Sequence, residues 1–119
     1  MAFDESLAAR ARAFLAAEAG FAEKRMFGGI CFLLDGNMCC GVAGADLMVR
    51  VGPDGDAAAI KQPHVRRFDL SGRPMAGWIL VAPGGTASAA GLKGWIARGV
   101  TFARTLPAKA EKKRKPMRR

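Results

Sequence analysis

Three cysteines and one histidine are the side chains of this chain that are best suited to metal or redox chemistry. Cys31, Cys39 and Cys40 lie in the stretch MFGGICFLLDGNMCCGV, and His64 follows. A zinc site needs ligands that converge tetrahedrally, commonly from two CxxC-like pairs or from cysteines with histidines. Adjacent cysteines on a strand point to opposite faces unless a bulge intervenes. The spacing therefore predicts no metal site, and no cofactor is expected.

A thiol pair is the better redox candidate, and it depends on the register of one hairpin. The sequence DGN at 35–37 allows either 35–36 or 36–37 as the central residues of the turn. The first choice places Cys31 opposite Cys40, close enough for a cross-strand disulfide. The second moves Cys31 opposite Val42, and the pair is lost. The cysteines are expected to be reduced and to fill the core. A redox role for Cys31 and Cys40 is the alternative.

Nucleophilic and phosphate-binding motifs are not indicated. His64 is the one histidine, and no motif places it beside a thiol. The glycines at 28–29 are followed by a predicted strand, without the GxGxxG or GxxxxGK[ST] pattern of a phosphate loop. No catalytic residue is assigned, and a non-enzymatic protein is expected.

The positive charge is concentrated at one end of the chain. Residues 108–119, AKAEKKRKPMRR, carry a net charge of +6, which leaves only +3 of the chain's total of +9 for residues 1–107. Seven basic side chains account for this: Lys109, Lys112, Lys113, Arg114, Lys115, Arg118 and Arg119. Such a segment can neutralise several phosphates and give weak, sequence-independent binding to DNA or RNA. The other reading is a disordered, solubilising tail.

Five further arginines are spread over the predicted sheet region: Arg25, Arg50, Arg66, Arg67 and Arg73. They could converge into an anion-binding surface. Because acidic residues are interspersed and strand side chains alternate between faces, a mixed, solvated sheet edge is the expected outcome. Within the turn-like sequence SGRP, Arg73 is the one residue considered for contact with a partner.

The elements that would position these residues can be read from periodicity. Helical spacing and a following glycine predict a helix over 4–19, and Ser88 can cap a last helix that ends before Pro107. Between them, the runs GICFLL, MCCGVAG and DLMVRV predict a three-stranded antiparallel meander. A short helix within 54–62 and the strands RRFDL and MAGWILVA follow, and APGGT at 82–86 is expected to be a loop.

This pattern predicts one α+β domain over 1–107. The expected order is α-β-β-β-α-β-β-α, in two layers, with an antiparallel sheet of about five strands and helices on one face. Residues 108–119 are expected to be a disordered basic tail. No apolar run reaches the roughly 20 residues that span a bilayer, and no export signal is evident, so a cytoplasmic protein without membrane contact is expected.

Three motifs carry a resemblance to a known family: KRMFGGICFLLDGNMCCGV at 24–42, DLMVRVGP at 46–53 and FDLSGRPMAGWILVAP at 68–83. Together they resemble the TfoX/Sxy N-terminal domain family in its short stand-alone form. The resemblance implies the same element order in an arrangement like that of secretion chaperones, and it supplies no catalytic residues. Longer members, which regulate natural competence, carry a second C-terminal domain where this chain has its basic segment. Nucleic acid, an unknown protein partner and a second copy of the chain remain open as partners.

Overall fold

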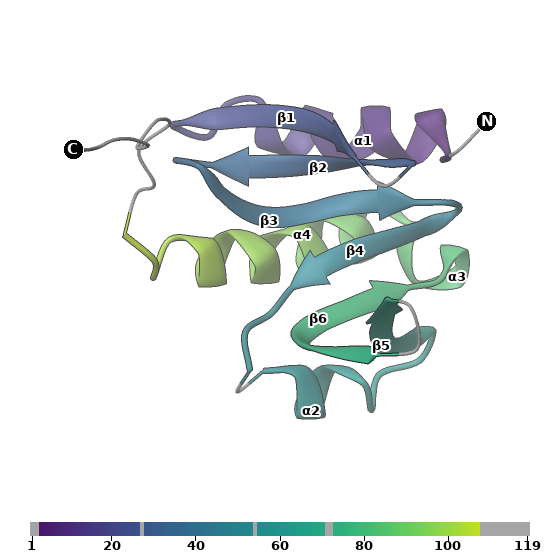
Figure 1. Cartoon of the computed structure of the whole chain (residues 1–119). Coiled ribbons are helices and arrows are strands. Elements are labelled where there is room, and N and C mark those ends of the chain that lie inside the picture. Colours follow the sequence, from purple (N-terminus) through teal and green to yellow (C-terminus); the bar gives the residue numbers. More distant parts are fainter. Residues whose placement is uncertain (1–2, 27, 54, 71–72, 108–119) are drawn as a thin grey trace.

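Six antiparallel strands form a sheet that carries helices on one face (Figure 1). The computed structural model describes residues 3–26, 28–53, 55–70 and 73–107. In chain order the elements are α1 (Glu5–Leu15), β1 (Phe21–Met26), β2 (Gly29–Leu34), β3 (Asn37–Ala43), β4 (Asp46–Arg50), α2 (Asp56–Ala59), β5 (Val65–Leu70), β6 (Arg73–Val81), α3 (Pro83–Thr86) and α4 (Ala89–Ala103). The strand order in the sheet is β1-β2-β3-β4-β6-β5. The predicted α+β class and the β2–β3–β4 meander are confirmed.

The sheet has one strand more than the sequence predicted. Strand β1 pairs with β2 along its whole length, from Phe21 opposite Leu34 to Met26 opposite Gly29. It lies at the edge of the sheet, and residues 22–25 are all exposed, so no alternation of apolar and polar residues marks it. The short helix α3, with Pro83 in its first turn, also replaces a predicted loop.

Helix α4 begins at the cap that the sequence predicts, and Asp4, predicted as the first residue of a helix over 4–19, is the cap of α1. The carboxylate of Asp4 accepts hydrogen bonds from the backbone N–H groups of Ser6 and Leu7, at 2.9 and 3.1 Å. The hydroxyl of Ser88 accepts one from Gly91 N–H at 3.0 Å. Such caps satisfy backbone donors that have no partner within the helix.

The main core lies between these two helices and the sheet. Leucines and isoleucines from both layers are fully buried there, among them Leu15, Ile30 and Leu92. Gly99 allows α4 to approach β3 closely, because a Cβ atom at this position would lie 2.4 Å from the carbonyl oxygen of Cys39. The layer of helices and the sheet, the two layers that the sequence predicts, are therefore in close contact at β3.

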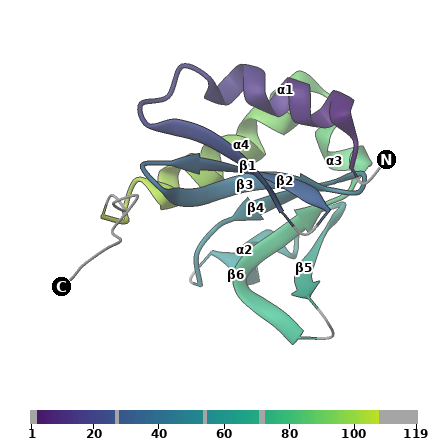
Figure 2. The same ribbon diagram turned by 45° about the horizontal axis from the view of Figure 1, so that its top comes forward.

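A second, smaller apolar cluster lies on the other face of the sheet. It contains Cys31, Met48, Trp78 and Leu80, and the ring of Phe68 packs against Trp78 with centroids 6.3 Å apart. The β5–β6 hairpin bends away from the other strands on the side opposite α1 and α4 (Figure 2). Among the described residues, no helix is long and apolar enough to cross a membrane.

Candidate functional site

The β2–β3 turn uses Asp35 and Gly36 as its central residues. Both have positive φ angles, 52° and 83°, and Leu34 is opposite Asn37. This is the geometry of a two-residue hairpin turn that matches the twist of the strands. At the turn itself, the first of the two predicted registers is therefore the observed one.

A bulge then changes the register before the cysteines are reached. Strand β3 has one extra residue, Cys39, at the point where β2 reaches Phe32. As a result Phe32 is opposite Cys40, and Cys31 is opposite Gly41. The predicted pairing of Cys31 with Cys40 is corrected by this bulge, since an extra residue shifts every pair beyond it.

The two cysteines of the predicted pair belong to different clusters. Cys31 packs with Met48 and Trp78 on the face away from α1 and α4, whereas Cys40 belongs to the core beneath the helices. All three cysteines are buried free thiols. Burial raises the pKa of the Cys31 thiol above its ordinary value.

The bulge instead brings Cys39 and Cys40 together. Their sulfurs are 3.7 Å apart, and both side chains lie in the core beneath the helices. The hydrogen bond between the two thiols lowers the pKa of Cys39, and the positive charge of Arg104 acts in the same direction, against burial and the negative charge of Glu18. That same hydrogen bond, together with burial, raises the pKa of Cys40 well above its ordinary value. The pair is thus asymmetric, and Cys39 is the more readily ionised thiol.

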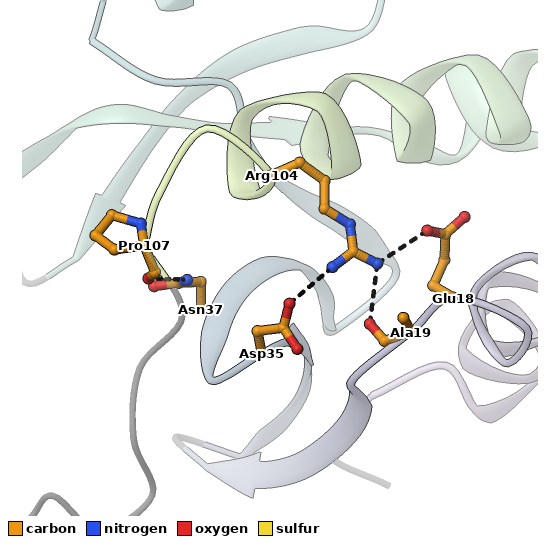
Figure 3. A network of polar contacts seen from close by, with 6 residues as sticks. All are labelled: Glu18, Ala19, Asp35, Asn37, Arg104 and Pro107. Atoms are coloured by element: carbon orange, nitrogen blue, oxygen red, sulfur yellow. Dashed lines mark hydrogen bonds and ion pairs between the residues drawn. The ribbon is translucent and has the colours of Figure 1, made fainter.

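Arg104, just after α4, connects three segments of the chain near this pair (Figure 3). Its guanidinium donates to Oδ2 of Asp35 at 3.0 Å, to Oε1 of Glu18 at 3.1 Å and to the carbonyl of Ala19 at 2.9 Å. Each contact is charge-assisted, because its donor is the positively charged guanidinium. The β2–β3 turn and the α1–β1 connection are thereby held against the end of α4.

Asn37 holds the segment that follows α4. Its side-chain amide is buried and donates a hydrogen bond to the carbonyl of Pro107 at 2.9 Å (Figure 3). Because a buried amide needs partners, this bond stabilises one position of Pro107 against β3. Asn37 therefore holds Pro107, the last described residue, at the sheet.

Two of the described arginines of the sheet, Arg25 and Arg66, lie on different strands and pair with different carboxylates. Arg25 on β1 approaches Glu5 at 3.7 Å, and Arg66 on β5 pairs with Asp46 at 2.7 Å. Strands β1 and β5 are the two opposite edges of the sheet. Arg25 and Arg66 therefore lie on mixed, solvated edges, as expected, and not in a shared anion-binding patch.

Arg50 has a different environment. Its guanidinium lies over the rings of Trp78 and Phe102, 5.8 and 5.4 Å from their centroids, and it points toward the carbonyl of Met38 at 3.5 Å. Arg67 is exposed on β5, and the side chain of Arg73 lies outside the described part of the structure. Arg50 therefore contributes to packing through its stem and its stacked charge.

His64 lies far along the chain from the thiols and packs against α3. It is exposed, has a φ of 68°, and its imidazole lies so close to Gly84 that a Cβ there would be 2.5 Å from Cε1. Within the described ranges, no group of three or more histidine, cysteine or acidic side chains could hold a metal ion.

An apolar groove of about 450 Å³ lies between α4 and the connection that follows β4. Its lining residues are Val51, Gly55, Ala97, Arg98, Thr101, Phe102 and Thr105.

The seven basic residues predicted to bind nucleic acid, Lys109 to Arg119, lie outside the described residues.

Sequence reasoning did not single out Arg104 or Asn37. The partners of Arg104 are 69 and 86 residues away in the sequence, so no local spacing marks them. The sequence places Asn37 in the predicted turn. The signal for its structural role is a polar residue at the start of an apolar strand, because a buried amide needs a hydrogen-bond partner.

Comparison with known protein families gives a match over most of the domain. The model of the family described as TfoX N-terminal domain matches residues 13–103. Neither the curated proteins nor the solved structures gave a match to the chain. The matched region runs from within α1 to the end of α4 and includes the whole sheet. The chain belongs to the TfoX N-terminal domain family.

Proposed function

We propose that the protein is a non-enzymatic regulatory module of the cytoplasm whose basic segment, residues 108–119, binds nucleic acid through its phosphates. The observation that carries the proposal is the separation of charge. The segment has a net charge of +6, against +3 for the whole of the preceding domain. Lysine and arginine clusters release counterions from nucleic acid and bind it without sequence preference.

The domain itself offers less free positive charge than its composition suggests. Arg12 pairs with Glu23 at 2.6 Å, and Arg104 pairs with Asp35 and Glu18. Paired arginines present a weaker field to a polyanion than unpaired ones do. The main electrostatic attraction is therefore assigned to the segment.

The hydrogen bond at Pro107 supports separate roles for the domain, residues 1–107, and the basic segment, residues 108–119. Its hydrogen bond with Asn37 joins the last described residue of the domain to β3. We expect charge changes beyond this point to leave the contacts of α4 and the sheet in place. In this proposal the domain supplies contacts for a regulatory process such as control of transcription or competence, and the segment supplies general affinity.

Replacement of the seven basic residues of 108–119 by glutamine in the full chain tests the proposal. Binding of a fluorescent DNA duplex is measured at several salt concentrations. The wild type should show a log–log salt slope as steep as about −6 if all seven side chains contact phosphates. The variant should lose most of this slope, with an unchanged thermal unfolding transition.

A full chain with the same segment residues in scrambled order is the matched control. Because the attraction depends on charge and not on order, the scrambled chain should bind like the wild type. A steep salt slope that persists in the glutamine variant would place nucleic-acid binding on the domain. No binding by the wild type at low salt would leave the segment a solubilising one.

A further inference from the structure

Cys39 and Cys40 form a pair of adjacent thiols that the bulge of β3 holds in contact. Their sulfurs are 3.7 Å apart, whereas Cys31 belongs to the cluster on the other face of the sheet. We propose that Cys39 and Cys40 are a reversible oxidation site, at which a hydroperoxide converts the two thiols into a disulfide between neighbouring residues.

The geometry that carries this proposal comes from the bulge. Neighbouring side chains on a regular strand point to opposite faces, so two adjacent cysteines would normally be kept apart. Here the extra residue places both sulfurs in the core beneath α1 and α4. Formation of the bond requires the sulfurs to approach from 3.7 Å to about 2.05 Å, without movement of any other element toward them.

The bond so formed is expected to be easily reduced. Adjacent Cα atoms are about 3.8 Å apart across a trans peptide, and the described residues contain no cis peptide. Disulfides usually join Cα atoms at least about 4.4 Å apart, and shorter spans are strained. Strained disulfides have more oxidising potentials and exchange with cellular thiols, so the modification is reversible.

The two thiols have different parts in the reaction. Cys39 is the attacking residue, because the hydrogen bond with Cys40 and the positive charge of Arg104 favour its thiolate. Its sulfur attacks one peroxide oxygen, the O–O bond breaks, and the other oxygen leaves as hydroxide and is protonated to water. Cys39 is then a sulfenic acid.

Cys40 completes the reaction. Its sulfur attacks the sulfur of Cys39, the S–O bond breaks, and the hydroxyl leaves as a second water after it takes up the proton of the Cys40 thiol. The two sulfurs together lose two electrons, and one molecule of hydrogen peroxide is reduced to two molecules of water; an organic hydroperoxide would give one alcohol and one water. Cys39 is itself buried, and the charges that act on it belong to Arg104 and Glu18, whose side chains are 33% and 38% exposed. In this proposal a small oxidant therefore approaches the thiol from their side.

The wild-type chain allows a direct test by differential labelling. The folded protein is treated with hydrogen peroxide, unfolded, and its free thiols are blocked with iodoacetamide. Disulfides are then reduced and labelled with N-ethylmaleimide. Trypsin releases all three cysteines in one peptide, residues 26–50, whose fragment masses assign each label. The proposal expects N-ethylmaleimide on Cys39 and Cys40, and iodoacetamide on Cys31.

N-ethylmaleimide on Cys31, or its absence from all three cysteines, would overturn the proposal. Two variants extend the test. C31S is the matched control and should form the same disulfide, which glutathione should reverse. C40S should stop at a sulfenic acid on Cys39 that dimedone traps, whereas a disulfide to Cys31 in this variant would contradict the proposal. If C40S does not fold, the labels on the wild-type chain decide.

Discussion

At the scale of single residues, the buried thiols should make the free energy of unfolding decrease at alkaline pH. Burial raises the pKa of Cys31, and the hydrogen bond with Cys39 together with burial raises that of Cys40. In the unfolded chain both ionise near the ordinary thiol pKa of about 8.5. The unfolded state then binds fewer protons than the folded state does, so stability is full below this pH and falls above it.

We therefore expect the free energy of unfolding in urea, measured with reductant present, to decrease between about pH 8 and about pH 9.5. The limiting slope is about 1.4 kcal/mol per pH unit for each thiol that stays protonated in the folded state. Cys39, whose pKa is lowered, acts with the opposite sign and offsets part of the decrease.

The variant C31S removes one of the two raised thiols and should have a shallower pH dependence than the wild type. The comparison uses the slope of each variant, so a general loss of stability in C31S does not affect it. A wild-type stability that is constant or rises over this range would show that these thiols do not govern it.

At the scale of elements, the packing of α4 on β3 depends on Gly99. A Cβ atom there would lie 2.4 Å from the carbonyl oxygen of Cys39, and backbone atoms cannot move aside as side chains do. We expect Gly99→Ala to lower the free energy of unfolding by about 1–3 kcal/mol, the usual effect of overpacking a core.

Gly94 lies in the same helix and is the matched control, because no atom lies within 4 Å of a Cβ built on it. In Gly94→Ala the helix gains propensity without a clash, and stability should rise by up to about 1 kcal/mol. Urea unfolding of both variants measures the contrast. Equal effects in the two variants would mean that α4 does not approach β3 as closely as the structure shows.

At the scale of the whole molecule, Arg104 joins parts of the chain that are distant in sequence. Its partners Glu18 and Asp35 lie in the α1–β1 connection and the β2–β3 turn. Exposed ion pairs contribute about 0–1 kcal/mol each, and a network with a backbone acceptor exceeds one isolated pair. Removal of the guanidinium in Arg104→Ala should therefore destabilise the fold by about 1–2 kcal/mol.

Arg98 on the same helix is the appropriate comparison. It stacks on Trp95 at 4.6 Å from the ring centroid, a contact that contributes about 0.5–1 kcal/mol at an exposed site. Thermal unfolding should show a larger loss for Arg104→Ala than for Arg98→Ala, and high salt should reduce the difference by screening the pairs. If both variants unfold alike, the network does not join the three segments energetically.

Much of the fold could be predicted from the sequence, because its signals are local. Ser88 caps the helix that it was expected to cap, and the runs of strand formers predicted the meander. The family motifs agree with the match over residues 13–103. The exposed edge strand β1 was missed because its pairing with β2, and not a pattern of its own, makes it a strand.

The sequence by itself determined the Ser88 cap of α4 and the class of fold, and it limited the β2–β3 turn to two choices, of which the structure has Asp35 and Gly36 at the centre. Only the tertiary structure decided which thiols meet. A bulge of one residue depends on how β3 packs beneath α4, and it moves the pair from Cys31 and Cys40 to Cys39 and Cys40. The partners of Arg104 were decided in the same way, since ion pairs across 69 and 86 residues form only once the helices and the sheet are packed together.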